Sequence, residues 1–75
     1  MHNEHKKIVT FFGAYHVLKA ERLLIKEGIA VETIAAPRHI STDCGICIRF
    51  MAGDEARVKA ILTAATIDIN GSHDE

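Results

Sequence analysis

The chain has 75 residues, of which 48% are hydrophobic and 25% are charged, a composition typical of one small globular domain. The net charge of −1 comes from nine basic and ten acidic residues, so no positive excess predicts binding to a nucleic acid or an anionic membrane. No apolar run approaches the ~20 residues of a transmembrane helix, and the polar start MHNEHKK is unlike a signal peptide. We therefore expect a cytoplasmic protein with one domain over residues 1–75.

The first half of the chain predicts a strand, a helix and a second strand. Residues 7–12, KIVTFF, are β-branched and aromatic, as residues of strands commonly are. After Gly13, residues 14–27 place apolar side chains at helical spacing. The face expected to be buried comprises Ala14, Val17, Leu18, Leu24 and Ile25. Gly28 stands where helices commonly end in a left-handed residue, and residues 29–34 form the next strand.

The second half predicts a strand, a helix and a short last strand. Residues 45–51, GICIRFM, alternate so that Cys47 and Met51 face away from Ile48. A second helix follows Gly53, with a buried stripe of Val58, Ile61, Leu62 and Ala65. Residues 66–69 read as the last strand. The ordered core would then span about 6–70, with residues 70–75 as a polar, frayed tail.

This order of elements predicts an α+β, ferredoxin-like βαββαβ sandwich, with one antiparallel four-stranded sheet and two helices on one face. The first and third strands contain the fewest polar residues, so we place them at the centre. The uncovered sheet face would show Cys47 and Met51, and a homo-oligomer is expected to cover it. The same topology places the 37–45 loop beside residues 13–16, near the positive end of the first helix dipole.

Residues 37–47, PRHISTDCGIC, contain the densest set of reactive groups in the chain. Cys44 and Cys47 have the C-x-x-C spacing of dithiol redox sites. The motif runs into a strand, however, where residues three apart are about 10 Å apart and a disulfide needs less than about 7 Å. A turn at Gly45 would be required. Zinc is disfavoured because His39, Cys44 and Cys47 supply three ligands where a closed site needs four. A metal that bridges two subunits stays open as an alternative, but we expect no metal.

A single reactive Cys44 is the remaining functional interpretation, and an inert cysteine at a strand start is its structural alternative. Arg38 and His39 lie close in sequence and would stabilise a thiolate. Glu21 lies within the apolar stripe of the first helix, where a carboxylate is costly unless it is paired. We expect Glu21 to form a salt bridge with a basic residue such as Arg49 or Arg38, in preference to an acid/base role.

Three stretches carry a resemblance to a known family: AERLL at residues 20–24, GI at 28–29, and APRHISTDCGICIRF at 36–50. Together they resemble the selenium/sulfur carrier-like proteins, small bacterial and archaeal domains, over about residues 7–69. The most specific part comprises Pro37-Arg38, Ile40-Ser41, Cys44-Gly45 and Arg49-Phe50. Members commonly have a small or apolar residue where this chain has Cys47, which favours a one-cysteine interpretation. Residues 13–16 depart from the Thr- and His-bearing pattern of the family.

The resemblance implies a carrier rather than a turnover catalyst. Cys44 would hold sulfur or selenium as a persulfide or selenosulfide, with Arg38 and His39 stabilising its thiolate and Cys47 as a secondary thiol. Supporting roles fall to Ser41, Gly45, Glu21 and Arg49. The expected partners are a sulfur- or selenium-mobilising enzyme and an acceptor enzyme, with no cofactor. Two other functions stay open: a thiol-redox or redox-sensing protein that uses both cysteines, and a small-molecule-binding regulatory module.

Overall fold

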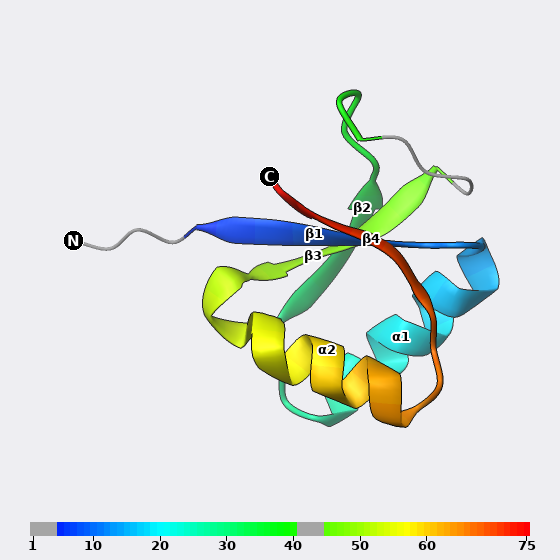
Figure 1. Cartoon of the computed structure of the whole chain (residues 1–75), viewed down its shortest axis with the longest axis vertical. Coiled ribbons are helices and arrows are strands. Elements are labelled where there is room, and N and C mark those ends of the chain that lie inside the picture. Colours follow the sequence, from blue (N-terminus) through cyan, green and yellow to red (C-terminus); the bar gives the residue numbers. More distant parts are fainter. Residues whose placement is uncertain (1–4, 41–44) are drawn as a thin grey trace.

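The computed structural model describes residues 5–40 and 45–75, which form a four-stranded sheet with two helices on one face (Figure 1). Its elements are β1 (Lys6–Phe11), α1 (Ala14–Lys26), β2 (Val31–Ala35), β3 (Ile46–Met51), the 3-10 turn η1 (Ala52–Asp54), α2 (Glu55–Ala64) and β4 (Ile69–Asp74). The sheet is antiparallel with the strand order β2-β3-β1-β4. The predicted α+β ferredoxin-like fold is confirmed, and β1 and β3 occupy the centre as expected.

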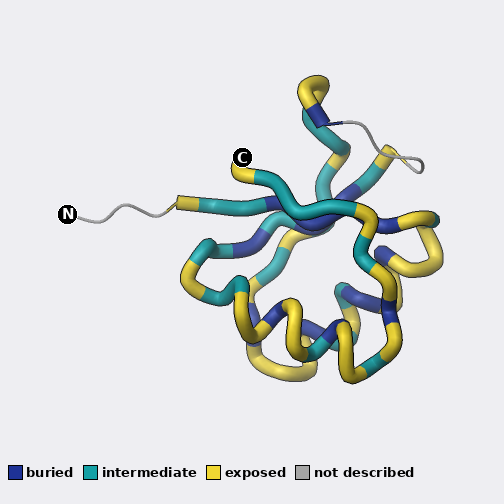
Figure 2. Tube along the Cα trace, viewed as in Figure 1, coloured by how far each residue is buried: buried dark blue, intermediate teal, exposed yellow. Residues whose placement is uncertain are grey.

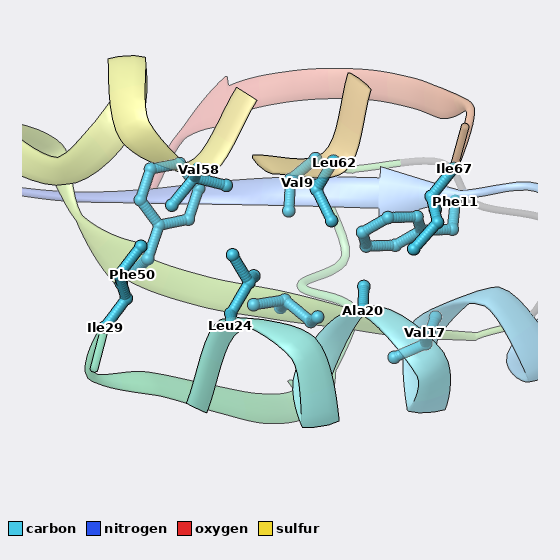
Figure 3. Close-up of a cluster of buried hydrophobic side chains, with 11 residues drawn as sticks. Val9, Phe11, Val17, Ala20, Leu24, Ile29, Phe50, Val58, Leu62 and Ile67 are labelled. Carbon is cyan, nitrogen blue, oxygen red and sulfur yellow. The ribbon is translucent and has the colours of Figure 1, made fainter. Parts of the chain in front are cut away.

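The main core lies between the sheet and the two helices (Figure 3). Strand alternation directs Val9 and Phe11 of β1 toward the helices, together with Ile48 and Phe50 of β3. Its buried members among the described residues are Val9, Phe11, Val17, Ala20, Leu24, Ile29, Ile48, Phe50, Val58, Leu62 and Ile67. Figure 2 shows these buried positions along the middle of the sheet and on the inner sides of the helices.

The α1 helix ends in a Schellman motif, as Gly28 predicted. Gly28 has a φ of +83°, a left-handed conformation that glycine adopts without steric cost. The Gly28 N–H donates to the Ile25 carbonyl at 3.0 Å, and the Ile29 N–H donates to the Leu24 carbonyl at 3.0 Å. Because the motif directs Ile29 into the main core, β2 begins only at Val31, two residues later than predicted.

The α2 helix ends in the same way, and this overturns the predicted last strand at 66–69. The Ile67 N–H donates to the Leu62 carbonyl at 2.9 Å, and the Thr66 N–H donates to the Thr63 carbonyl at 3.0 Å. Thr66 has a φ of 62°, a left-handed conformation rare for a β-branched residue. The β-branched residues Thr66 and Ile67, which suggested a strand, therefore lie at the end of a helix.

The predicted frayed tail at 70–75 is also wrong, because these residues belong largely to β4. This strand pairs with β1 from Lys7↔Asp74 to Phe11↔Ile69. The Lys7 ammonium lies 3.6 Å from the Asp74 carboxylate and 3.0 Å from that of Glu55. Hydrogen bonding to His5 and the charge of Lys7 lower the pKa of Asp74. Long-range pairing thus makes an edge strand out of a sequence with low strand propensity.

The α1 helix presents a different face to the sheet than its periodicity predicted. Val17, Ala20 and Leu24 are fully buried, whereas Leu18 and Ile25 are 53% and 57% exposed. Apolar residues occur on more than one side of this helix, so spacing alone does not select the buried side. The prediction that Leu18 and Ile25 are buried is therefore wrong.

Candidate functional site

The β2–β3 loop, which carries the predicted reactive cysteine, is closed at its base by backbone pairing. The last register pair of the two strands is Ala35↔Ile46, and the Ala36 N–H donates to the Gly45 carbonyl at 3.0 Å. Gly45 has a φ of +78°, and an added Cβ would meet nothing within 4 Å. The backbone conformation, and not a lack of space, therefore requires glycine at this position. This gives a physical basis to the supporting role predicted for Gly45.

The first half of the loop turns back onto the sheet. The Ile40 N–H donates to the Pro37 carbonyl at 3.0 Å, which leaves Arg38 and His39 exposed at the corner of the turn. Ile40 is only 5% exposed and packs with Ile8 and Cys47. We call these three buried residues, with the adjoining Ile34 and Ala36, the Ile40 cluster. Residues 36–40 lie on the side of the sheet away from the helices (Figure 1).

Cys47 points to the sheet face without helices, as predicted, but it is not exposed there. Its exposed fraction is 0% because Ile40 and Ile8 pack over it. Met51, at the far end of β3, is half-buried. The chain's own loop therefore covers part of the face that a second copy was expected to cover. Burial also disfavours a dithiol site, since a cysteine without exposed surface is generally inert toward external reagents.

Two of the predicted site residues, Cys44 and Ser41, lie outside the described residues. The sheet registers place the end of β2, the start of β3 and the end of β1 at one edge, where α1 also begins. This agrees with the expected neighbourhood of the loop. The described part of the loop, however, packs on the face away from α1. Stabilisation of a Cys44 thiolate by the helix dipole thus stays a prediction.

Arg49 lies on the same face as Cys47 and joins two carboxylates. Its Nη2 and Nε lie 2.6 Å and 2.9 Å from Glu32 Oε1, and its Nη1 lies 2.9 Å from Glu75 Oε2. Hydrogen bonds to Glu75 and Glu32 raise the pKa of Arg49, and the bond from Arg49 lowers the pKa of Glu32. Arg49 thus connects β2, β3 and the residue after β4, which is a structural role.

The expected salt bridge of Glu21 to Arg49 is wrong. Glu21 is half-buried on α1, on the opposite side of the sheet from Arg49, whose carboxylate partners are Glu32 and Glu75. Within the described ranges, Glu21 has no ion pair with Arg38 either. The structure therefore brings together Gly45, Cys47 and the Pro37–Ile40 turn, but not Glu21.

The described residues also bear on the metal and membrane predictions. Within 5–40 and 45–75, no three side chains of His, Cys, Asp or Glu gather so as to hold a metal ion. The zinc alternative included Cys44, which lies outside these ranges. In the same part of the chain, every helix is too short or too polar to cross a membrane.

Besides β4 and the burial of Cys47, two features escaped prediction from the sequence. The first is the anchoring role of Ile40, for which a signal existed, because Ile40 is the single aliphatic residue in the polar run PRHISTD. The second is the exposure of apolar residues on α1: Tyr15 is 71% exposed and Phe12, just before the helix, is 55% exposed. An excess of apolar residues over what one buried face needs was the available signal.

One comparison with known proteins gives a match. A family model described as "Putative Se/S carrier protein-like" matches residues 6–74, which is nearly the whole chain and includes every predicted site residue. No curated protein and no solved structure matches the chain.

Proposed function

Because the chain belongs to the Se/S carrier protein-like family, we propose that it holds sulfur or selenium on Cys44 and delivers the atom to an acceptor enzyme. The observation that carries the proposal is the complete burial of Cys47. The chain has two cysteines, and a thiol without exposed surface cannot attack a donor on another protein. The carrier role is therefore assigned to Cys44.

The loop architecture supports a carrier segment held at both ends. Ile40 is anchored in the Ile40 cluster, and Gly45 is hydrogen-bonded to Ala36 at the start of β3. Cys44 directly precedes Gly45 in the chain. Holding both ends of a reactive segment reduces the conformational entropy lost when a partner binds it. Gly45 thus contributes a backbone conformation that a residue with a side chain adopts only with strain.

The transfer step requires no cofactor and no external oxidant. The Cys44 thiolate attacks the outer sulfur of a donor persulfide, R–S–SH, and forms a new S–S bond. The S–S bond of the donor breaks, and the donor leaves as the thiolate R–S⁻, so that the carrier becomes Cys44–S–SH. With a selenosulfide donor, R–S–SeH, the attack falls on selenium. An acceptor nucleophile then takes the outer atom and regenerates the Cys44 thiolate.

Arg38 and His39 are proposed to stabilise that thiolate. Both side chains are exposed at the corner of the Pro37–Ile40 turn, within six positions of Cys44 in the chain. A nearby cation favours the thiolate over the thiol. The donor and acceptor would be cytoplasmic enzymes that mobilise and use the chalcogen, so the chain acts as a carrier and not as a turnover catalyst.

The test is the intact mass of the protein after incubation with a cysteine desulfurase and cysteine. We expect the wild type to gain one sulfur atom that a reducing agent removes, and Cys44→Ser to gain none. Cys47→Ala serves as the control, because serine would place a hydroxyl in the apolar Ile40 cluster and destabilise it. Cys47→Ala should load like the wild type.

Other results would favour the alternatives. A loss of two hydrogens that requires both cysteines would make the protein a dithiol redox protein. If neither this enzyme nor glutathione persulfide adds sulfur to Cys44, the carrier function is wrong, and a regulatory binding module becomes the better explanation.

A further inference from the structure

The outward side of α1 combines exposed apolar groups with cations. Tyr15, Leu18 and Ile25 are 71%, 53% and 57% exposed. Lys19, Arg22 and Lys26 are also exposed. They lie beside the apolar residues because positions three, four and seven apart share one side of a helix. We call these six residues the outer α1 face. Among the described residues, it holds most of the large apolar side chains that remain exposed.

The cations of the outer α1 face differ from three basic side chains that form ion pairs. Lys7, Arg49 and Lys59 each lie within 4.0 Å of a carboxylate. Within residues 5–40 and 45–75, no carboxylate pairs with Lys19, Arg22 or Lys26. At 100° per residue, the acidic residues of this region, Glu21 and Glu27, project from the two flanks of the helix and not from its outer side. The face is therefore locally positive on a chain whose net charge is −1.

A hollow of about 310 Å³ lies on this face, lined by Tyr15, Leu18, Lys19 and Arg22. Tyr15 and Leu18 contribute apolar groups to its lining, and Lys19 and Arg22 contribute two cations. Binding hot spots commonly consist of one apolar or aromatic side chain inserted into such a hollow, surrounded by complementary polar groups. The ligand that fits this hollow is an apolar side chain flanked by carboxylates.

The outer α1 face begins at the end of the sheet that carries the β2–β3 loop. Tyr15 lies in the first turn of α1, and α1 begins at the sheet edge where β2 ends and β3 starts (Figure 1). Residues 36–40 of that loop pack on the opposite face of the sheet, so a protein bound to the outer α1 face would reach the loop by extending around this end of the sheet. A second copy of the chain is a poor occupant, because a two-fold contact would place three cations against three cations.

We propose that the outer α1 face docks the enzyme that loads Cys44, an enzyme bearing a cysteine persulfide and presenting carboxylates around an apolar side chain. This inference rests on the proposed carrier function. Docking accelerates the same balanced exchange, in which the Cys44 thiolate takes the outer sulfur and the donor leaves as a thiolate. It does so by raising the concentration of the donor persulfide near the loop.

The experiment compares two routes of sulfur loading, followed by intact mass. The enzymatic route uses a cysteine desulfurase with cysteine, at enzyme concentrations where the rate is proportional to enzyme. The chemical route uses glutathione persulfide, which needs no protein surface. The test variants are Arg22→Glu and Leu18→Glu. The matched control is Arg57→Glu, which reverses an exposed arginine on α2, hydrogen-bonded to the carbonyl of Glu27 at the far end of α1.

We expect Arg22→Glu and Leu18→Glu to load about tenfold more slowly than the wild type by the enzymatic route, and Arg57→Glu to load at the wild-type rate. All proteins should load equally from glutathione persulfide, which shows that the substitutions leave the reactivity of Cys44 unchanged, and circular dichroism checks that each variant is folded. Equal enzymatic rates for Arg22→Glu and wild type would overturn the docking face and leave the carrier function intact. Equal slowing by Arg57→Glu would overturn it too, since net charge would then be the cause.

Two further results separate this inference from the function on which it rests. If glutathione persulfide loads Cys44 of the wild type and the desulfurase does not, docking of this donor is wrong while the carrier chemistry stands. If neither donor loads Cys44, the proposed function fails and the docking inference fails with it.

Discussion

The two faces of the sheet are covered by different means. On one face, both helices pack against β1 and β3 and bury an extensive main core. On the other, the Pro37–Ile40 turn covers Ile8 and Cys47, and the ion pairs of Arg49 lie on the same face. The difference suggests that the main core stabilises the domain, whereas the Ile40 cluster holds the β2–β3 loop.

The expected free energies support this assignment of roles. Burial of one large aliphatic side chain contributes about 1.5–3 kcal/mol, so three buried residues cannot offset the conformational entropy of a whole domain. They can, however, hold a loop in place. Free energies of local opening range from near zero to the full free energy of unfolding. We expect the Ile40 cluster to open locally while the main core stays folded.

The largest effect is expected from a cavity in the main core. Leu24 is fully buried between α1 and the sheet (Figure 3), and Leu24→Ala should lower the free energy of unfolding by about 3 kcal/mol. Urea denaturation followed by circular dichroism measures the change. For a small domain with a total stability of about 5–10 kcal/mol, this is a large fraction. A change near that of an exposed substitution would contradict the assignment of stability to this face.

At the Ile40 cluster, we expect a smaller loss of global stability and a larger increase in local opening. In a Cys44→Ser background, Ile40→Ala should lower the free energy of unfolding by about 2 kcal/mol, the lower end for such truncations. Cys47 should then react with a thiol reagent about thirtyfold faster, because each 1.4 kcal/mol lost from loop closure multiplies the open population by about ten and about 2 kcal/mol is lost.

Ile25→Ala provides the matched control for this experiment. It makes the same truncation at a position that is 57% exposed, so Cys47 should react at its original rate. If Ile40→Ala also leaves the rate unchanged, Cys47 becomes accessible only through global unfolding, and the two faces of the sheet act as one cooperative unit.

Local sequence signals predicted the parts of the fold that depend on local physics. The alternation of GICIRFM predicted β3 and the direction of Cys47, because side chains of a strand alternate by geometry alone. Gly28 predicted the end of α1, because few other residues adopt its φ of +83°. The central positions of the first and third strands were predicted from their low content of polar residues.

The features that escaped prediction depend on contacts far apart in the sequence. Pairing with β1 makes residues 69–74 a strand, although their composition resembles a tail. Packing against Ile8 and Cys47 turns Ile40 into an anchor, although it lies in a polar run. The choice between the two apolar sides of α1 depends on the sheet beneath it and not on the helix. The exposure of Cys47 was mispredicted for the same reason.

The smallest effect is expected at the ion pairs of the face without helices. Arg49 lowers the pKa of Glu32, so the charged form of Glu32 is stabilised in the folded state. This contribution is fully present above the pKa of Glu32 in the unfolded chain, about 4.3. It is lost as the pH falls through the lower folded-state pKa. Glu32→Gln has nearly the shape of protonated glutamate and isolates the charge.

At neutral pH, we therefore expect Glu32→Gln to have a slightly lower urea midpoint than the wild type, and the gap should close as the pH falls below about 4. The gap should also shrink in 1 M salt, because exposed ion pairs are screened. Glu27→Gln is the control, since Glu27 has no ion pair within the described ranges, and it should show no pH-dependent gap. A gap that persists at low pH would mean that the Glu32 side chain stabilises this face by packing, as the Ile40 cluster does, and not by charge.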